Sequence, residues 1–174
     1  MTIDIMKYFG IRCDWTQNLI SIPHQDYSAR DIHIESDWSA ASYYYEMAAL
    51  SDEVDLYLNG LHKHSGQGDS EIKKIMEGFG VETEFTSDGV HLKKGKCTES
   101  FFRYNFRSCP DIAQTVLATC SGLNIPAQFT GVETLKIKET NRMYAMQKEL
   151  DDLGFYLNEH DEKWNLGTSG QQEL

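Results

Sequence analysis

The chain has 174 residues, of which 40% are hydrophobic and 25% charged, a balance typical of globular proteins that excludes a disordered chain. Its 27 acidic residues outnumber its 16 basic ones, so the formal net charge of −11 repels polyanions and argues against a nucleic-acid partner. No run approaches the roughly 20 apolar residues of a membrane span, and the first residues lack the layout of a secretory signal, so we expect a cytoplasmic protein without a membrane partner.

Three segments along the chain repeat one pattern of a helix end, a glycine, a strand, a polar turn and a second strand. The segments are residues 5–22, 75–92 and 149–166. Their glycines, Gly10, Gly80 and Gly154, each stand where the end of a helix favours a positive φ. The pattern therefore predicts three helix-hairpin elements that recur every 70 to 74 residues.

A second pair of segments predicts a helix that leads into a strand. Asp37 opens a helix rich in small residues, and Asp111 opens a similar helix 74 residues later. The strands that follow lie within 54–61 and 127–137. Aspartate at a helix start is typical of an N-cap worth about 1 kcal/mol, and we keep this interpretation for Asp37.

Together the two patterns define a repeated βαβαββ unit and an α/β fold. One unit is too small to hold a core alone, so adjacent units should pack their helices together with the sheets outside. We expect one whole unit from about Ile32 to Leu92, and the chain begins inside a helix at Thr2. This layout suggests a truncated array of units.

The densest ionic cluster follows the last of these predicted strands. Lys138, Glu139 and Arg142 crowd a junction before a helix, where the helix N-terminus adds positive potential that suits an anionic ligand. The spacing of Glu139 and Arg142 is also that of a simple surface salt bridge. Taken alone, Asp111 is better explained as a helix cap than as a functional carboxylate, although both interpretations stay open.

Metal and disulfide chemistry are weakly indicated. The four cysteines show no CxxC spacing, and we expect all of them to be buried thiols. His62 and His64, with Asp69 nearby, are the best candidates for metal ligands, but two loop histidines without an orienting third ligand do not make a zinc site. We predict no metal site.

Four segments together resemble the 5-enolpyruvylshikimate-3-phosphate synthases in order and spacing. They are DWSAASYYYEMAA, HSGQGDSEI, CPDIAQT and GVETLKIKETNR. The resemblance implies the enolpyruvyl transferase fold, an inside-out α/β barrel of two domains with three βαβαββ units each. It also implies that residues 1–31 end the last unit of the first domain, that 32–166 form units of the second, and that 167–174 are a polar tail.

The resemblance implies a transferase of the shikimate pathway, which leads to the aromatic amino acids. Such an enzyme joins the enolpyruvyl group of phosphoenolpyruvate to the 5-hydroxyl of shikimate 3-phosphate, releases phosphate, and needs no metal or redox cofactor. Asp111 then matches the proton acceptor at the shikimate hydroxyls and Lys138 the lysine beside it. Glu139 matches the carboxylate that moves a proton at the methylene carbon, and Arg142 an arginine that binds phosphoenolpyruvate.

Several features depart from the family pattern. Thr134 stands where some members have an asparagine that touches the shikimate phosphate, and Asn141 replaces a common aspartate. The family's lysine-serine phosphate segment and its late DHR motif are absent, so we expect the chain alone to be inactive. The alternatives are a fragment of the related transferase that acts on UDP-N-acetylglucosamine, or a non-catalytic repeat module that binds a partner.

Overall fold

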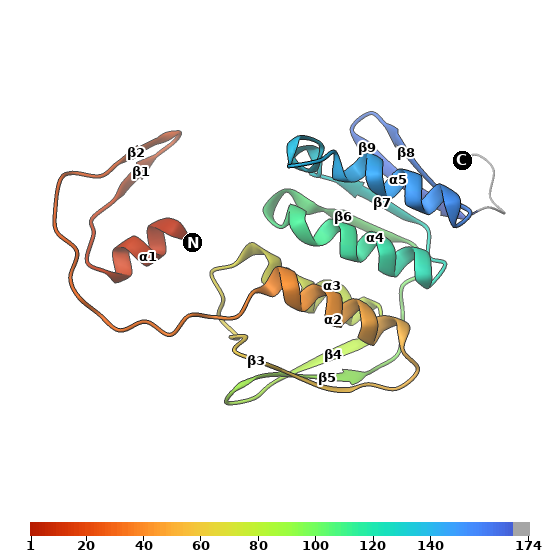
Figure 1. Cartoon of the computed structure of the whole chain (residues 1–174), viewed down its shortest axis with the longest axis horizontal. Coiled ribbons are helices and arrows are strands. Elements are labelled where there is room, and N and C mark those ends of the chain that lie inside the picture. The colour runs from red at the N-terminus through yellow and green to blue at the C-terminus, as the bar shows by residue number, and fades with distance from the viewer. Residues whose placement is uncertain (169–174) are drawn as a thin grey trace.

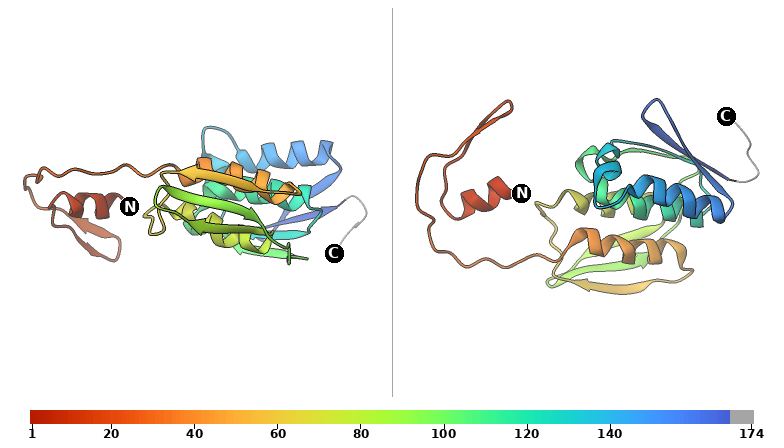
Figure 2. Two further views of the ribbon diagram at one scale, coloured as in Figure 1. Left: turned by 90° about the horizontal axis from the view of Figure 1, so that it is seen from below. Right: turned by 45° about the horizontal axis from the view of Figure 1, so that its top comes forward.

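The structure is a computed structural model, and it describes residues 1–168. Its first group of elements lies apart from the rest of the molecule (Figure 1). This group contains α1 (Thr2–Tyr8), β1 (Asp14–Thr16) and β2 (Leu19–Ser21). Residues 22–37 form neither helix nor strand and connect this group to the main body, as both views of Figure 2 show.

The main body consists of a middle and a last group of elements. The middle group contains α2 (Trp38–Leu50), β3 (Asp55–Asn59), the 3₁₀ helix η1 (Gly68–Glu71), α3 (Ile72–Gly78), β4 (Val81–Phe85) and β5 (Gly89–Lys94). The last group contains β6 (Phe102–Asn105), the 3₁₀ helices η2 (Phe106–Ser108) and η3 (Pro110–Ile112), α4 (Ala113–Gly122), β7 (Ala127–Thr130), the 3₁₀ helix η4 (Glu133–Ile137), α5 (Arg142–Asp152), β8 (Phe155–His160) and β9 (Lys163–Thr168). The last group is therefore a complete βαβαββ unit, and the α/β prediction is confirmed.

Each group has its own sheet; α2, α3 and α4 lie between the two sheets, and α5 packs on its own sheet beside α4. The strand order is β3-β5-β4 in the middle group and β6-β7-β9-β8 in the last, where β6 and β7 are parallel and the other pairs antiparallel. Helix α2 contacts α3 and α4, and α4 contacts α5, while the strands cover these helices from outside (Figure 1). The predicted packing of helices inside and sheets outside is confirmed.

The predicted whole unit from Ile32 to Leu92 is wrong at its first strand. The corresponding strand of the last group, β6, pairs with β7 over its full length. The segment before α2 instead makes one backbone hydrogen bond to the turn after β3, from the amide of Ser36 to the carbonyl of Gly60, at 2.8 Å. A single bond does not fix a strand, and the segment leaves the sheet edge toward the first group (Figure 1).

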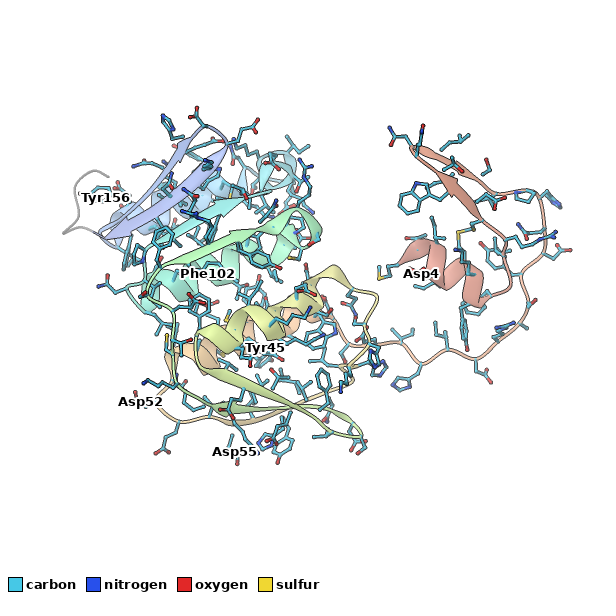
Figure 3. All side chains as sticks on the ribbon, turned by 180° about the vertical axis from the view of Figure 1, so that it is seen from behind. Asp4, Tyr45, Asp52, Asp55, Phe102 and Tyr156 are labelled. Atoms are coloured by element: carbon cyan, nitrogen blue, oxygen red, sulfur yellow. The ribbon has the colours of Figure 1, made fainter. Side chains whose placement is uncertain are left out.

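Buried polar and aromatic contacts join the two groups into one core. The hydroxyls of Ser42 on α2 and Thr115 on α4 lie 2.9 Å apart and are buried. The ring of Phe79, after α3, lies 5.1 Å from that of Phe102 on β6. Within the middle group, Tyr45, labelled in Figure 3, extends from α2 to the hydroxyl of Thr83 on β4. The first two contacts hold the middle and last groups together.

Other predictions from the sequence have mixed outcomes. Cys109 and Cys120 are buried, but Cys97 is exposed and Cys13 is half-buried because the segments around them lie outside the core, so the cysteine prediction is half wrong. Residues 167 and 168 end β9 rather than belonging to a tail, because β9 pairs with β8 to its end. Residues 169–174 of the predicted tail lie outside the described part. No helix within residues 1–168 is long and apolar enough to cross a membrane.

The three glycines end their helices as predicted. Gly10, Gly80 and Gly154 follow α1, α3 and α5 with φ values of 87°, 82° and 84°. At Gly80 an added Cβ would also lie 2.8 Å from the backbone nitrogen of Cys97. A side chain in this backbone region costs about 1–2 kcal/mol before any clash is counted.

We therefore expect Gly80→Ala to lower the free energy of unfolding by about 2 kcal/mol or more, measured by urea denaturation at pH 7. Gly66→Ala is the matched control, because an added Cβ there meets only the side chain of Met1 at 3.8 Å. Equal stability of the two variants would contradict the role assigned to the helix-ending glycine.

Candidate functional site

The helices of the main body begin at one end of the molecule. The N-terminal ends of α2, α4 and α5 all point toward the side on which α1 lies (Figure 1). Free amide groups and aligned peptide dipoles make helix N-termini favourable for anions. At α2, the side chain of Asp37 accepts a hydrogen bond from the amide of Ser39 at 2.9 Å, so the N-cap predicted for Asp37 is confirmed.

Asp111 does not act as a cap. It lies in η3, directly before α4, and neither η3 nor α4 has a side-chain cap. One carboxylate oxygen, Oδ1, lies 3.1 Å from the Nζ atom of Lys138 and 3.3 Å from the Nη1 atom of Arg142. The side chain therefore turns away from its own helix toward two cations from the segment around the start of α5.

The segment that carries these cations differs from the prediction in its local structure. The strand β7 ends at Thr130, and residues 133–137 form the 3₁₀ helix η4 rather than a continuation of the strand. Lys138 follows η4 in an extended conformation. Asn141 caps α5, accepting a hydrogen bond from the amide of Tyr144 at 3.0 Å, so that Arg142 is the first residue of the helix.

Arg142 connects two carboxylates. Its Nε and Nη2 atoms lie 2.9 Å and 2.8 Å from Oε1 of Glu139, while Nη1 faces Asp111. The predicted salt bridge at this spacing therefore exists, but the same guanidinium also reaches a residue 31 positions earlier. The structure thus brings together the four site residues Asp111, Lys138, Glu139 and Arg142, which we call the ionic cluster.

The ionic cluster is open to solvent. The exposed fractions of the side chains are 27% for Arg142, 35% for Lys138, 40% for Asp111 and 65% for Glu139. Exposed ion pairs contribute little to stability, typically about 0–1 kcal/mol each. The cluster is therefore poorly explained as a stabilising device, and its charged groups are accessible to a ligand from solution.

Glu139 is a carboxylate at neutral pH. A hydrogen bond from its own backbone amide lowers the pKa of its side chain, and the hydrogen bond from Arg142 lowers it further. Because the charged form is favoured in the folded chain, Glu139 is an acceptor of protons and hydrogen bonds at pH 7. With Asp111 it gives the cluster two carboxylates and two cations, a set that can move protons and bind an anionic ligand.

The remaining candidates lie outside the ionic cluster. Thr134 is exposed on η4, and no side-chain hydrogen bond of Thr134 occurs within residues 1–168. His62 lies in the loop before η1, where its backbone amide donates to Glu35 at 3.0 Å. Within residues 1–168 no three histidine, cysteine, aspartate or glutamate side chains are grouped so that they could hold a metal ion.

One residue beside the cluster was considered in the sequence only as a neighbour of two candidate metal-binding histidines. Asp69 in η1 is buried, and its pKa responds to the charges of Asp111 and Lys138. The sequence places it in a polar loop 42 residues before Asp111, and no spacing rule connects the two. The signal that could have connected it to the site was its place in the segment HSGQGDSEI, one of the four segments of the family resemblance.

Comparisons with known proteins show which family the chain resembles. A family model described as EPSP synthase (3-phosphoshikimate 1-carboxyvinyltransferase) matches residues 1–172. A 3-phosphoshikimate 1-carboxyvinyltransferase of Bacteroides fragilis is 44% identical over 164 residues, which are 93% of this chain and 40% of that protein. Proteins of the same name from Methanosphaera stadtmanae and Vibrio campbellii are 31% and 30% identical, over 88% and 93% of this chain and 37% and 38% of their own lengths. The chain thus spans about 40% of the length of these relatives.

Proposed function

Because the chain belongs to the EPSP synthase family, we propose that it supplies part of the active site of a 3-phosphoshikimate 1-carboxyvinyltransferase. The observation that carries this proposal is the ionic cluster, in which Asp111 meets Lys138 at 3.1 Å and Arg142 at 3.3 Å across 27 and 31 residues of sequence. The cluster lies where the helices of the main body begin, an end of the molecule that favours anions. Both proposed substrates, shikimate 3-phosphate and phosphoenolpyruvate, are anions.

The proposed reaction has two stages that place different demands on the site. In the addition, the 5-hydroxyl oxygen of shikimate 3-phosphate bonds to the central carbon of phosphoenolpyruvate, the hydroxyl loses its proton, and the methylene carbon gains one. In the elimination, the resulting methyl group loses a proton, the carbon-oxygen bond to phosphate breaks, and the double bond re-forms. The site therefore needs a base, a group that moves a proton at carbon, and cations for the phosphate and carboxylate groups.

The ionic cluster contains a residue for each demand. We assign Asp111 as the acceptor of the hydroxyl proton and Lys138 as the cation that holds the same hydroxyl region. Glu139 moves the proton at the methylene carbon: its exposed, ionised carboxylate can take a proton from the methyl group in the elimination, and the protonated form can give one to the methylene carbon in the addition. Arg142 binds phosphoenolpyruvate, since a planar guanidinium matches a carboxylate or phosphate with two parallel hydrogen bonds. We retain Thr134 as a residue that touches the shikimate phosphate once substrate is bound.

We also propose that the first group of elements belongs to a different domain from the main body. Residues 1–31 would end one domain and 32–166 would form units of the second. In support, the hairpin β1-β2 leaves the large apolar side chains of Trp15 and Leu19 exposed, as expected for an element whose packing partners belong to other parts of a protein.

A chimera tests the proposed function. In it, this chain replaces the matched 40% of the Bacteroides fragilis protein, so that the rest of the site is supplied by the relative. We expect the chimera to release phosphate from shikimate 3-phosphate plus phosphoenolpyruvate, and the isolated chain to show no turnover, because orientation and binding energy from the other residues are lost.

Two results would contradict the proposal. A folded chimera without synthase activity would contradict the assignment of this segment to the active site. Turnover of about 10 per second by the isolated chain, a value typical of complete enzymes, would show that the other part of the site is not needed. Turnover with a UDP-linked sugar in place of shikimate 3-phosphate would favour the related transferase.

A further inference from the structure

Asp69 is a buried carboxyl group at the edge of the ionic cluster. It lies in η1 and is 9% exposed, and its Oδ2 atom accepts a hydrogen bond from the hydroxyl of Ser39 in the first turn of α2. Buried aspartate is rare because removing a charge from water is costly, so each instance needs a reason. One neutral hydroxyl is a weak partner for a buried carboxylate.

The position of Asp69 is fixed by close backbone contacts. Gly68 lies against the backbone carbonyl of Ser108, so closely that any Cβ at Gly68 would clash with its oxygen. Through this contact η1 lies against η3, the 3₁₀ helix that carries Asp111. On the other side, the side chain of Gln67 accepts a hydrogen bond from the amide of Trp38 at 3.0 Å. The loop is thus held between the start of α2 and the segment of Asp111.

The charges around Asp69 come from three other segments. Burial raises its pKa most, and the hydrogen bond from Ser39 opposes this effect. The charges of Asp111 and of Asp37 raise the pKa further, while the ammonium of Lys138 lowers it. Asp69 is therefore coupled to two members of the ionic cluster.

We propose that Asp69 is a positioning residue of the active site, whose buried carboxylate promotes proton acceptance by Asp111 and helps to hold Lys138. This inference rests on the proposed function. Because η1 packs against η3, the carboxylates of Asp69 and Asp111 repel each other, and a proton on Asp111 relieves this repulsion. Asp111 would reach that protonated state when it accepts the substrate hydroxyl proton.

Ionised Asp69 is favourable for the proposed role in the site but unfavourable for the stability of the folded chain. The pKa of Asp69 is raised in the folded state, so the folded chain binds this proton more tightly than the unfolded chain does. Ionisation of Asp69 therefore destabilises the fold as the pH rises through its unfolded and then its folded pKa, and the cost is fully present above the folded value. Asparagine lacks this cost and keeps an acceptor for Ser39, so Asp69→Asn should be at least as stable as the wild type at pH 7.

The first test measures the coupling in the chain itself and is independent of enzyme activity. Titration of the Asp69 carboxyl carbon by NMR should give a midpoint above the ordinary aspartate value of about 3.9. In Asp111→Asn the midpoint should fall, and in Lys138→Met it should rise. Midpoints that stay unchanged in both variants would overturn the proposal.

The second test measures the consequence in the chimera. We expect Asp69→Asn to lower kcat roughly tenfold, a part of the effect usual for acid-base catalysis, with less change in either KM. The pH profile of kcat should lose its dependence on the Asp69 midpoint. Asp52→Asn is the matched control, because it removes a carboxylate from an exposed position after the far end of α2, which is not among the charges that act on Asp69.

The outcomes separate this inference from the proposed function. If Asp69→Asn destabilised the chain but left the pH profile of kcat unaltered, Asp69 would serve only as a structural hydrogen-bond acceptor for Ser39. That result would overturn the proposal. An inactive chimera would contradict the proposed function, and the NMR titration would then still decide whether Asp69 and Asp111 are coupled.

Discussion

Replacing Asp111 with asparagine in the chimera is expected to lower kcat about 10²–10⁴-fold, the usual contribution of a general base. Asparagine has nearly the same shape, but it cannot accept the proton of the 5-hydroxyl. It also leaves Lys138 and Arg142 without their shared carboxylate, which lies 3.1 Å and 3.3 Å from them. Initial rates of phosphate release at saturating substrate measure the effect.

The same variant separates a catalytic role from a structural one. Asp111 makes no capping hydrogen bond and is 40% exposed, so its loss should change the free energy of unfolding by less than about 1 kcal/mol. Full activity in a folded Asp111→Asn chimera would refute the assignment of the base. Asp37→Asn, the same change at a true N-cap, should keep nearly normal turnover.

The repeated elements could be predicted because each depends on local rules. A glycine with positive φ ends a helix, and alternating residues such as those of 81–85 form a strand, so the three helix-hairpin elements follow from short stretches of sequence. The first strand of the unit expected from about Ile32 shows where this reasoning stops. A strand also needs a partner edge, and pairing is a property of the whole fold.

The site shows the same division between local and long-range information. The salt bridge of Glu139 and Arg142 follows from their spacing, whereas the convergence of Asp111 with Lys138 depends on the packing of α4 against α5. The family resemblance supplied that pairing where spacing could not. It did not supply Asp69, because burial beside Asp111 becomes visible only when η1 and η3 are seen in contact.

Removal of the guanidinium at the start of α5 tests whether Arg142 binds phosphoenolpyruvate. We expect Arg142→Ala in the chimera to raise the KM for phosphoenolpyruvate roughly 100-fold, since a charge-assisted contact to an anion contributes about 1.5–3 kcal/mol. The KM for shikimate 3-phosphate should change less, because Lys138 and Asp111 remain. Arg142→Lys keeps the charge but loses the fork of hydrogen-bond donors, and we expect an intermediate KM.

Whether KM or kcat changes distinguishes an anion-binding arginine from one that only holds two carboxylates in place. If Arg142 served only to orient Asp111 and Glu139, its removal would lower kcat with both KM values nearly unchanged, and that result would contradict the assignment. Lys148→Ala is the matched control, because it removes a cation from an exposed position on the same helix, outside the ionic cluster. A comparable rise in KM there would mean that the net charge of α5, rather than the contact made by Arg142, attracts the substrate.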